Sequence, residues 1–225
     1  MPTHKSIITA ETFRFFRDLS RNNRKEWMDQ NRERYQRHLA QPLRDLLAAL
    51  SPAVLKLHSG FDVSNHRGVN FSRINRDIRF AKDKTPYRAQ MYVFFPPQGG
   101  KNRQPGQLYV GINADTVTAG FRIYFDPKTK TSALAGRVAE LPAWSAQQRR
   151  RLARKYESYW YSMEKGQWTK NESWPSTPEQ WKKLKAWIVR RRMKPATALR
   201  PAFPADAAKI FRDLFPLFRF TSLSA

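Results

Sequence analysis

The chain contains no cysteine among its 225 residues. It can therefore form no disulfide, no thiolate zinc site and no iron–sulfur cluster, and it offers no cysteine nucleophile. Zero cysteine is compatible with a reducing compartment, and we expect a cytoplasmic protein. Long apolar runs are also missing, because no stretch approaches the roughly 18 residues of a membrane helix. The first ten residues lack the apolar core of a secretory signal, so the sequence predicts neither a span nor export.

The usual sequence marks of catalysis and metal binding are scarce. The four histidines, His4, His38, His58 and His66, are scattered without metal-ligand spacing. No glycine-rich phosphate loop, nucleophile elbow or His-Glu-x-x-His pattern occurs. We therefore expect no metal and no cofactor, and the sequence leaves open whether the protein is an enzyme.

Acidic residues are few beside the basic ones. The chain has 42 Lys and Arg against 18 Asp and Glu, which gives a formal net charge of +24. A surface of this sign attracts polyanions over long range. Hydrophobic residues at 40% provide enough apolar side chain for a folded core. Nucleic acid, DNA or RNA, is the first expected partner, and anionic lipid or a phosphorylated ligand is the second.

Apolar spacing predicts helices, then strands, then helices. Helices are expected over 9–19 with Thr9 as N-cap, from a capping pair at Asn23 and Glu26, and from Pro42 onward. Short runs rich in β-branched and aromatic residues predict strands at 91–95, 107–113 and 117–125. A last amphipathic helix is expected over 205–220. The order indicates an α+β fold with N-terminal helices, a central, mainly antiparallel sheet and a basic helical C-terminal segment.

We expect two segments, an α+β core over 1–140 and a basic, Trp-rich helical segment over 141–225 packed on that core. Residues 141–200 hold 15 Lys and Arg against 4 Asp and Glu, with six of the seven tryptophans. Thr177, Pro178 and Gln180 predict a helix start, and Trp181, Leu184 and Ile188 would form its apolar face. Its basic residues are the predicted nucleic-acid contacts: Lys182, Lys183, Lys185, Arg190, Arg191 and Arg192. Rings among such cations can stack on bases, although a tryptophan with helical spacing is more often core.

The densest motif is the 16-residue stretch 73–88. It carries six basic residues and two aspartates, and residues 73–87 have the pattern R-x-x-R-D-x-R-F-x-K-D-K-x-P-Y, followed by Arg88. The predicted phosphate- or anion-binding residues are its six cations: Arg73, Arg76, Arg79, Lys82, Lys84 and Arg88. Asp77 and Asp83 are the candidate catalytic groups. Three interpretations stay open: an ion network that fixes a loop, an anion site whose arginines the aspartates orient, and a two-aspartate metal site.

This pattern resembles the signature of an uncharacterised bacterial and fungal family, domain of unknown function 2461. The resemblance covers roughly residues 8–140. It extends upstream to Phe13, Leu19, Asn22, Asn23, Arg24, Glu26, Trp27, Asn31 and Tyr35, and downstream to Tyr109, Val110, Gly120 and Arg137. The family has no established activity, so the resemblance supports the fold and leaves the function open.

The function predicted from these features is that of a polyanion-binding accessory protein, with nucleic acid as its partner. No helix-turn-helix or zinc-finger pattern suggests a sequence-specific regulator. The alternative is an enzyme acting on a phosphorylated substrate at the motif 73–88. The position of the two aspartates separates these two hypotheses. Carboxylates in a concave pocket favour the enzyme, whereas carboxylates paired with arginines on a convex surface favour the binder.

Overall fold

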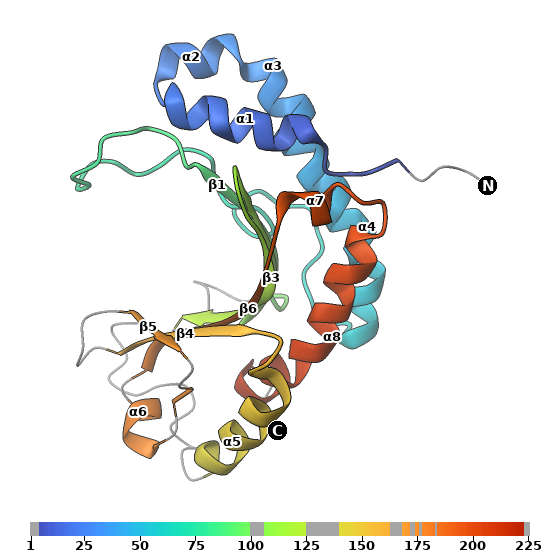
Figure 1. Ribbon diagram of the computed structural model, residues 1–225, viewed down its shortest axis with the longest axis vertical. Coiled ribbons are helices and arrows are strands. Elements are labelled where there is room, and N and C mark those ends of the chain that lie inside the picture. Colours follow the sequence, from blue (N-terminus) through green and yellow to red (C-terminus); the bar gives the residue numbers. More distant parts are fainter. Residues whose placement is uncertain are drawn as a thin grey trace. The chain divides into compact units, whose positions relative to one another are not determined.

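The computed structural model describes residues 5–99, 106–124, 140–162, 168–171, 174–175, 177–182 and 184–222 (Figure 1). Its helices are α1 (Ala10–Arg21), α2 (Lys25–Gln30), α3 (Arg32–Tyr35), the π-helical turn η1 (Gln36–Ala40), α4 (Gln41–Leu57), α5 (Leu141–Leu152), α6 (Pro178–Lys182), α7 (Pro195–Ala198) and α8 (Phe203–Ser222). Its strands are β1 (Gln90–Phe95), β2 (Gln107–Asn113), β3 (Val117–Tyr124), β4 (Glu157–Ser162), β5 (Trp168–Asn171) and β6 (Leu184–Met193). The strand order is β1-β2-β3-β6-β4-β5. The predicted α+β class with a mainly antiparallel sheet is confirmed.

The chain forms two compact units that alternate along the sequence. Unit 1 comprises Met1–Phe95, Tyr109–Thr118 and Met193–Lys209, and unit 2 comprises Pro96–Leu108, Ala119–Arg192 and Ile210–Ala225. Both units take residues from either side of position 140, and the division of the chain into 1–140 and 141–225 stays a prediction. No helix in the described part of the chain is long and apolar enough to cross a membrane.

Unit 1 is built on the N-terminal helices and β1. Helix α1 begins after Thr9, as predicted, and buries Phe13, Phe15, Phe16 and Leu19. α3, η1 and α4 follow one another without a break, and α4 contacts β1. Pro42 lies in the first turn of α4, where its missing N–H costs no hydrogen bond. The apolar face of α4, with Leu43, Leu46, Leu47 and Leu50, completes this core.

The hairpin between β2 and β3 turns at Asn113. The side-chain oxygen of Asn113 accepts hydrogen bonds from the backbone N–H groups of Asp115 and Thr116, at 2.9 and 2.7 Å. The backbone N–H of Asn113 donates to the carbonyl of Thr116. An asparagine that bonds its own backbone two residues on favours such a turn.

Unit 2 has a core of tryptophans. Trp187 is fully buried, with ring centroids of Trp174 and Trp181 at 5.1 and 5.3 Å from its own and Phe121 at 5.7 Å. Trp160 is also buried, opposite Trp187 in the antiparallel pair β4–β6. Trp181 is therefore core, as its spacing predicts. These four buried indoles are not available to stack on bases.

The helix predicted from Thr177 ends at Lys182, and the basic run after it is strand β6. The C-terminal segment is therefore mixed, with β4, β5 and β6 among its helices. The start signal at Thr177 and Pro178 was correct, but Trp187, Ile188 and Val189 are aromatic or β-branched and suit a strand. Leu184, Ala186 and Val189 are buried in β6, and the pairing with β4 decides the local conformation.

Candidate anion-binding site

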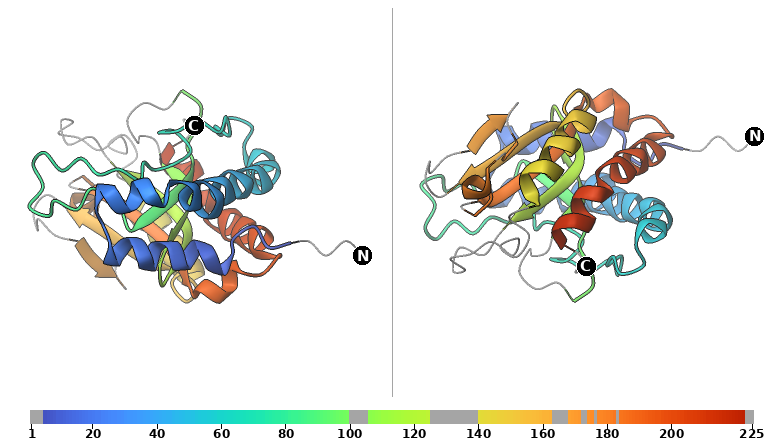
Figure 2. Two further views of the ribbon diagram at one scale, coloured as in Figure 1. Left: turned by 90° about the horizontal axis from the view of Figure 1, so that it is seen from above. Right: turned by 90° about the horizontal axis from the view of Figure 1, so that it is seen from below.

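Residues Arg73–Arg88 form an extended hairpin, called the arm below, which projects from the helices of unit 1 (Figures 1 and 2). Its two strands meet at the antiparallel bridge of Asn75 with Tyr87. The backbone N–H of Arg76 donates to Pro86 at 2.8 Å, and that of Arg88 donates to Ile74 at 2.7 Å. The family motif thus encodes a hairpin whose base is closed by backbone hydrogen bonds.

Asn23 holds the base of the arm. Its side-chain amide donates to the carbonyl of Tyr87 at 2.9 Å, and its side-chain oxygen accepts from the Tyr87 N–H at 3.0 Å. The prediction that Asn23 caps the next helix is wrong, because Arg24 occupies the N-cap position of α2. The Asn23 side chain instead bonds both backbone polar groups of Tyr87, as a neighbouring strand would. The ring of Tyr87 is buried.

Ion pairs within the arm occupy both aspartates. Asp77 accepts two hydrogen bonds from the guanidinium of Arg79, at 2.9 and 2.7 Å. Asp83 accepts from the Arg76 guanidinium and, at 2.9 Å, from the backbone N–H of Thr85. Both carboxylate side chains are 61% exposed. They are paired with local arginines on an exposed hairpin, and neither lines the cavity described below.

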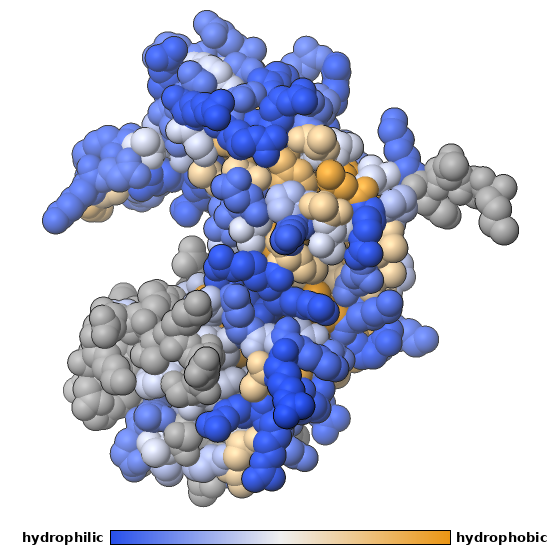
Figure 3. All heavy atoms as spheres, viewed as in Figure 1, coloured by the Kyte–Doolittle hydropathy of each residue, from blue (hydrophilic) through white to orange (hydrophobic). Residues whose placement is uncertain are grey.

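The other cations of the arm form fewer interactions with the described residues than Arg76 and Arg79 do. Lys84 donates to the carbonyl of Ile78 at 3.1 Å, which closes the tip. Arg73, Lys82 and Arg88 are exposed and form neither an ion pair nor a side-chain hydrogen bond with any described residue. Phe80 at the tip is 95% exposed, and the Arg79 guanidinium lies 5.9 Å from its ring centroid. The arm therefore presents unpaired charge and an exposed ring, on the otherwise hydrophilic projection in Figure 3.

A cavity of about 400 Å³ lies at the base of the arm within unit 1. Its lining comes from the end of α3 through α4, from the segment 65–75 and from β1: Tyr35, Ala40, Leu43, Arg44, Asn65, Arg67, Phe71, Ser72, Arg73, Ile74, Asn75 and Met91. Three arginines and no carboxylate line it. None of the three arginines pairs with an acidic side chain in the described ranges. The cavity is therefore a concentration of positive charge without an internal counterion.

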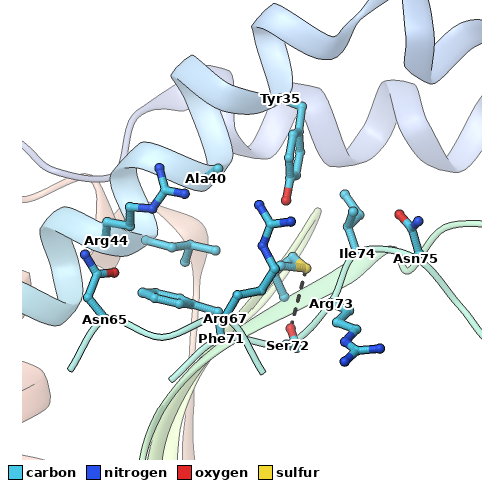
Figure 4. Close-up of a pocket in the computed structure, with 12 residues that line it drawn as sticks. Tyr35, Ala40, Arg44, Asn65, Arg67, Phe71, Ser72, Arg73, Ile74 and Asn75 are labelled. Atoms are coloured by element: carbon cyan, nitrogen blue, oxygen red, sulfur yellow. Dashed lines mark hydrogen bonds between the residues drawn. The ribbon is translucent and has the colours of Figure 1, made fainter. Parts of the chain in front are cut away.

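The π-helical turn η1 lies between Tyr35 and Arg44, two residues that line the cavity. Tyr35 precedes the π turn and Ala40 is its last residue. Arg44 follows four residues later, and all three line the cavity. Single π turns inside helices occur frequently at functional sites. Figure 4 shows the Tyr35 hydroxyl directed at the guanidinium of Arg67, with Arg44 reaching the cavity from α4 and Arg73 turned away from Tyr35.

The phenol of Tyr35 is a hydrogen-bond donor in the lining of the cavity. The residue is only 9% exposed, and its hydroxyl bonds to no other residue in the described part of the chain. Burial raises the pKa of Tyr35, and the positive charges of Arg67, Arg44 and Arg32 oppose that rise. The hydroxyl therefore stays protonated at neutral pH and can donate to an anion.

The residues predicted as anion-binding divide between the cavity and the arm. Arg73 lines the cavity, whereas Arg76, Arg79, Lys82, Lys84 and Arg88 lie along the arm. Tyr35, Arg44 and Arg67 were not predicted as site residues. Tyr35 belongs to the family pattern without any assigned role, and no local signal distinguishes Arg44 and Arg67 from the other 40 basic residues.

The predicted nucleic-acid contacts of the C-terminal segment have a different setting, on β6. Arg190 and Arg192 both approach Glu157, at 3.5 and 3.7 Å, and Arg190 lies over the ring of Tyr159 at 4.6 Å. Arg191 is exposed and Lys185 is half-buried. Lys183 and the side chain of Lys182 lie outside the described residues. The six residues thus do not form the single basic helix face that the sequence predicted.

Comparison with known families extends the resemblance noted in the sequence. No curated protein matches the chain significantly. A family model described as conserved hypothetical protein DUF2461 matches residues 11–220. The match continues past residue 140, so the Trp-rich C-terminal segment belongs to the family pattern as well. The arm, the cavity and most of both units lie within it. Arg137, part of the resemblance, falls outside the described residues. The chain is a member of the DUF2461 family.

Proposed function

We propose that this protein binds nucleic acid through the arm and the adjoining cavity of unit 1. The observation that carries the proposal is the uncompensated charge of this surface. Arg44, Arg67 and Arg73 line the cavity and Lys82 and Arg88 stand on the arm, all without an acidic partner among the described residues. Lysine and arginine that neutralise phosphates release condensed counterions, which drives binding.

The exposed ring of Phe80 supports single-stranded nucleic acid as the form bound. The Phe80 side chain is 95% exposed, so its ring is accessible to a base. Bases stack on such rings for about 1–3 kcal/mol each. The neighbouring Arg79 guanidinium is available to a phosphate of the same strand, because its pair with Asp77 is exposed to solvent.

The setting of the aspartates favours binding over the alternative of an enzyme built on the motif 73–88. Asp77 and Asp83 are both hydrogen-bonded to arginines of the arm, and neither lines the cavity. A general acid or base must reach the reacting group from such a cavity. The carboxylates instead orient Arg76 and Arg79, in keeping with the anion-site interpretation of the motif.

Fluorescence anisotropy with single-stranded oligonucleotides tests the proposal. We expect binding at about 50 mM salt that weakens steeply as salt rises. Changing Arg73, Lys82 and Arg88 together to Gln should lower the slope of log K against log salt by about 1 for each phosphate that the variant no longer neutralises. Phe80→Ala should weaken binding with little change in that slope.

A matched control removes the same charge elsewhere in unit 1. Arg17, Arg21 and Lys25 are exposed residues of α1 and α2 that do not line the cavity. Their joint change to Gln should leave most of the affinity. No binding by the unmodified protein at low salt would disprove the proposal, and equal losses in both triple variants would reduce it to nonspecific charge attraction.

A further inference from the structure

We propose that the cavity at the base of the arm is a receptor for a terminal phosphate monoester carried on a nucleoside. The phosphate would lie among Tyr35, Arg44 and Arg67, and the nucleoside against the apolar lining. The source is either the 5′-phosphate end of a nucleic-acid strand or a free mononucleotide. The strand-end form rests on the proposed nucleic-acid binding, whereas the free-nucleotide form does not.

The charge of the cavity fits a dianion. Three arginines line it, no carboxylate does, and none of the three pairs with an acidic side chain in the described ranges. Arg73 is turned away from Tyr35 (Figure 4), so Arg44 and Arg67 are the two whose charge acts on the phenol. A phosphate monoester carries about −1.5 to −2 at neutral pH, whereas an internal phosphodiester carries a single charge. Guanidinium groups bind phosphate oxygens through paired hydrogen bonds. A monoester therefore neutralises more of the cavity than one phosphate of a continuous strand.

Tyr35 supplies a neutral donor at the same place. Its hydroxyl is directed at Arg67 in Figure 4, and the neighbouring guanidinium groups cannot be hydrogen-bond acceptors for it. An anionic oxygen between Tyr35 and Arg67 would accept from both groups at once. Such a ligand would give the Tyr35 hydroxyl, which bonds to no described residue, an anionic acceptor.

The remaining lining suits a nucleoside. Leu43, Phe71, Ile74 and Met91 offer an apolar wall, and the amides of Asn65 and Asn75 can donate and accept hydrogen bonds. A volume of about 400 Å³ lies within the range of small-molecule sites, which usually combine apolar walls with a few polar groups. Inorganic phosphate alone would leave this apolar part unused.

The cavity is continuous with the arm. Arg73, Ile74 and Asn75 line the cavity and are also the first residues of the arm. A strand with its phosphorylated end in the cavity could therefore continue along Lys82, Arg88 and Phe80. An internal phosphate carries sugars on both sides and fits a recess less easily than a chain end does. The geometry thus suggests recognition of an end rather than of a sequence.

The test compares oligonucleotides of one sequence, labelled at the 3′ end, with either a 5′-phosphate or a 5′-hydroxyl. We expect the phosphorylated strand to bind at least about 10-fold more tightly, as one or two charge-assisted hydrogen bonds provide. Titration calorimetry with AMP, adenosine and inorganic phosphate identifies the free-ligand form. AMP should bind more tightly than either of its two parts.

Variants connect the discrimination to the cavity. Tyr35→Phe retains the buried ring and removes only the hydroxyl, while Arg67→Gln and Arg44→Gln remove one charge each. Each should reduce the preference for 5′-phosphate several-fold while leaving the 5′-hydroxyl strand nearly unaffected. Arg17→Gln, which removes an exposed charge outside the cavity, should retain the preference. Thermal melts of all variants check that the fold is retained.

The outcomes separate this proposal from nucleic-acid binding in general. Equal binding of both strands, together with no binding of AMP, overturns the cavity proposal and leaves the proposed function intact. AMP binding that depends on Tyr35 and Arg67, with no binding of either strand, supports the free-nucleotide form and overturns the proposed function. Binding of AMP, adenosine or phosphate that ignores the cavity variants also overturns the cavity proposal.

Discussion

Asp83 shows how the arm uses acidic residues among many cations. The Thr85 backbone N–H lowers the pKa of Asp83 most, followed by the hydrogen bond from Arg76, and together with the Thr85 hydroxyl they bring it to about 2. Asp77 likewise has a lowered pKa, chiefly because of the Arg79 side chain. Both aspartates therefore remain charged through the whole neutral and mildly acidic range.

A titration tests this assignment for Asp83. Because its pKa is lowered on folding, the stabilisation it provides is complete above the ordinary value of 3.8 and is lost as the pH falls toward about 2. We expect the carboxyl carbon of Asp83, followed by NMR, to titrate near 2 while the protein stays folded. Thr85→Val removes the hydroxyl but keeps the backbone N–H, and should raise that pKa only in part. A midpoint near 3.8 in the unmodified protein would contradict these hydrogen bonds.

The exposure of Asp83 also sets the cost of its removal. Its side chain is 61% exposed, although that of Arg76 is 25% exposed, so the pair is only partly buried and breaking it should cost much less than breaking a fully buried pair. Asp83→Asn should shift the melting temperature by no more than a few degrees while weakening the order of the arm tip. Faster amide hydrogen exchange at residues 76–85, with the exchange of α1 and α4 unchanged, would show this. A large loss of global stability would imply a buried pair and contradict the exposed hairpin.

At the scale of elements, the sequence predicted those helices and turns that short-range interactions determine. The α1 helix, the Pro42 helix and the Asn113 turn follow from caps, apolar spacing and side-chain bonds to nearby backbone. A helix was predicted through residues 184–192 because Trp181, Leu184 and Ile188 have helical spacing, but residues 184–193 form strand β6. Its pairing with β4, 22 or more residues away, overrode that spacing.

The candidate site was only half predictable for the same reason. The arm is one continuous motif, so its cations could be named from the sequence. The cavity joins Tyr35 and Arg44 of the helical segment to Arg67 and Arg73 of the segment before β1, and only tertiary packing brings them together. The π turn between Tyr35 and Arg44 carries no recognised sequence signal.

Gly120 of β3 tests the close packing of β3 on β6. A Cβ placed there would lie 2.4 Å from the carbonyl oxygen of Val189 and 2.8 Å from the Cα of Arg190. These are backbone atoms, which cannot move aside as a flexible side chain can. Gly120→Ala should cost about 1–3 kcal/mol, as overpacking usually does. A chemical denaturation midpoint equal to that of the unmodified protein would show that the two strands lie further apart.

Two triple variants of equal charge compare the arm with β6. Arg190 and Arg192 already interact with Glu157, so they should bind fewer phosphates than unpaired residues do. Changing Arg190, Arg191 and Arg192 to Gln should therefore lower oligonucleotide affinity less than changing Arg73, Lys82 and Arg88. Anisotropy titrations at one salt concentration decide between the two surfaces, and a larger loss from β6 would move the main binding surface to unit 2.

At the scale of the whole molecule, a net charge of +24 destabilises the folded state through repulsion among the cations. The same charge favours association with polyanions. The visible ion pairs, such as Arg32 with Asp29 and Arg37 with Glu33, are mostly exposed and contribute little. Repulsion among the remaining cations acts over about 10 Å at 0.1 M salt and weakens as salt rises. The same salt competes with polyanions for the surface. Folding stability and nucleic-acid affinity should therefore respond to salt in opposite directions.

Thermal melts in sodium chloride test this opposition. We expect the melting temperature to rise between about 20 and 300 mM salt, the range over which screening grows most, while oligonucleotide affinity falls. At equal ionic strength phosphate should raise the melting temperature more than chloride, because a ligand that binds only the folded state stabilises it by mass action. Arg67→Gln should reduce the extra effect of phosphate to the part that comes from its exclusion from the protein surface, and should keep the effect of chloride. A melting temperature that falls with salt would mean that attractive ion pairs outweigh the repulsion. An equal response to the two anions would leave the cavity arginines without a preferred ligand.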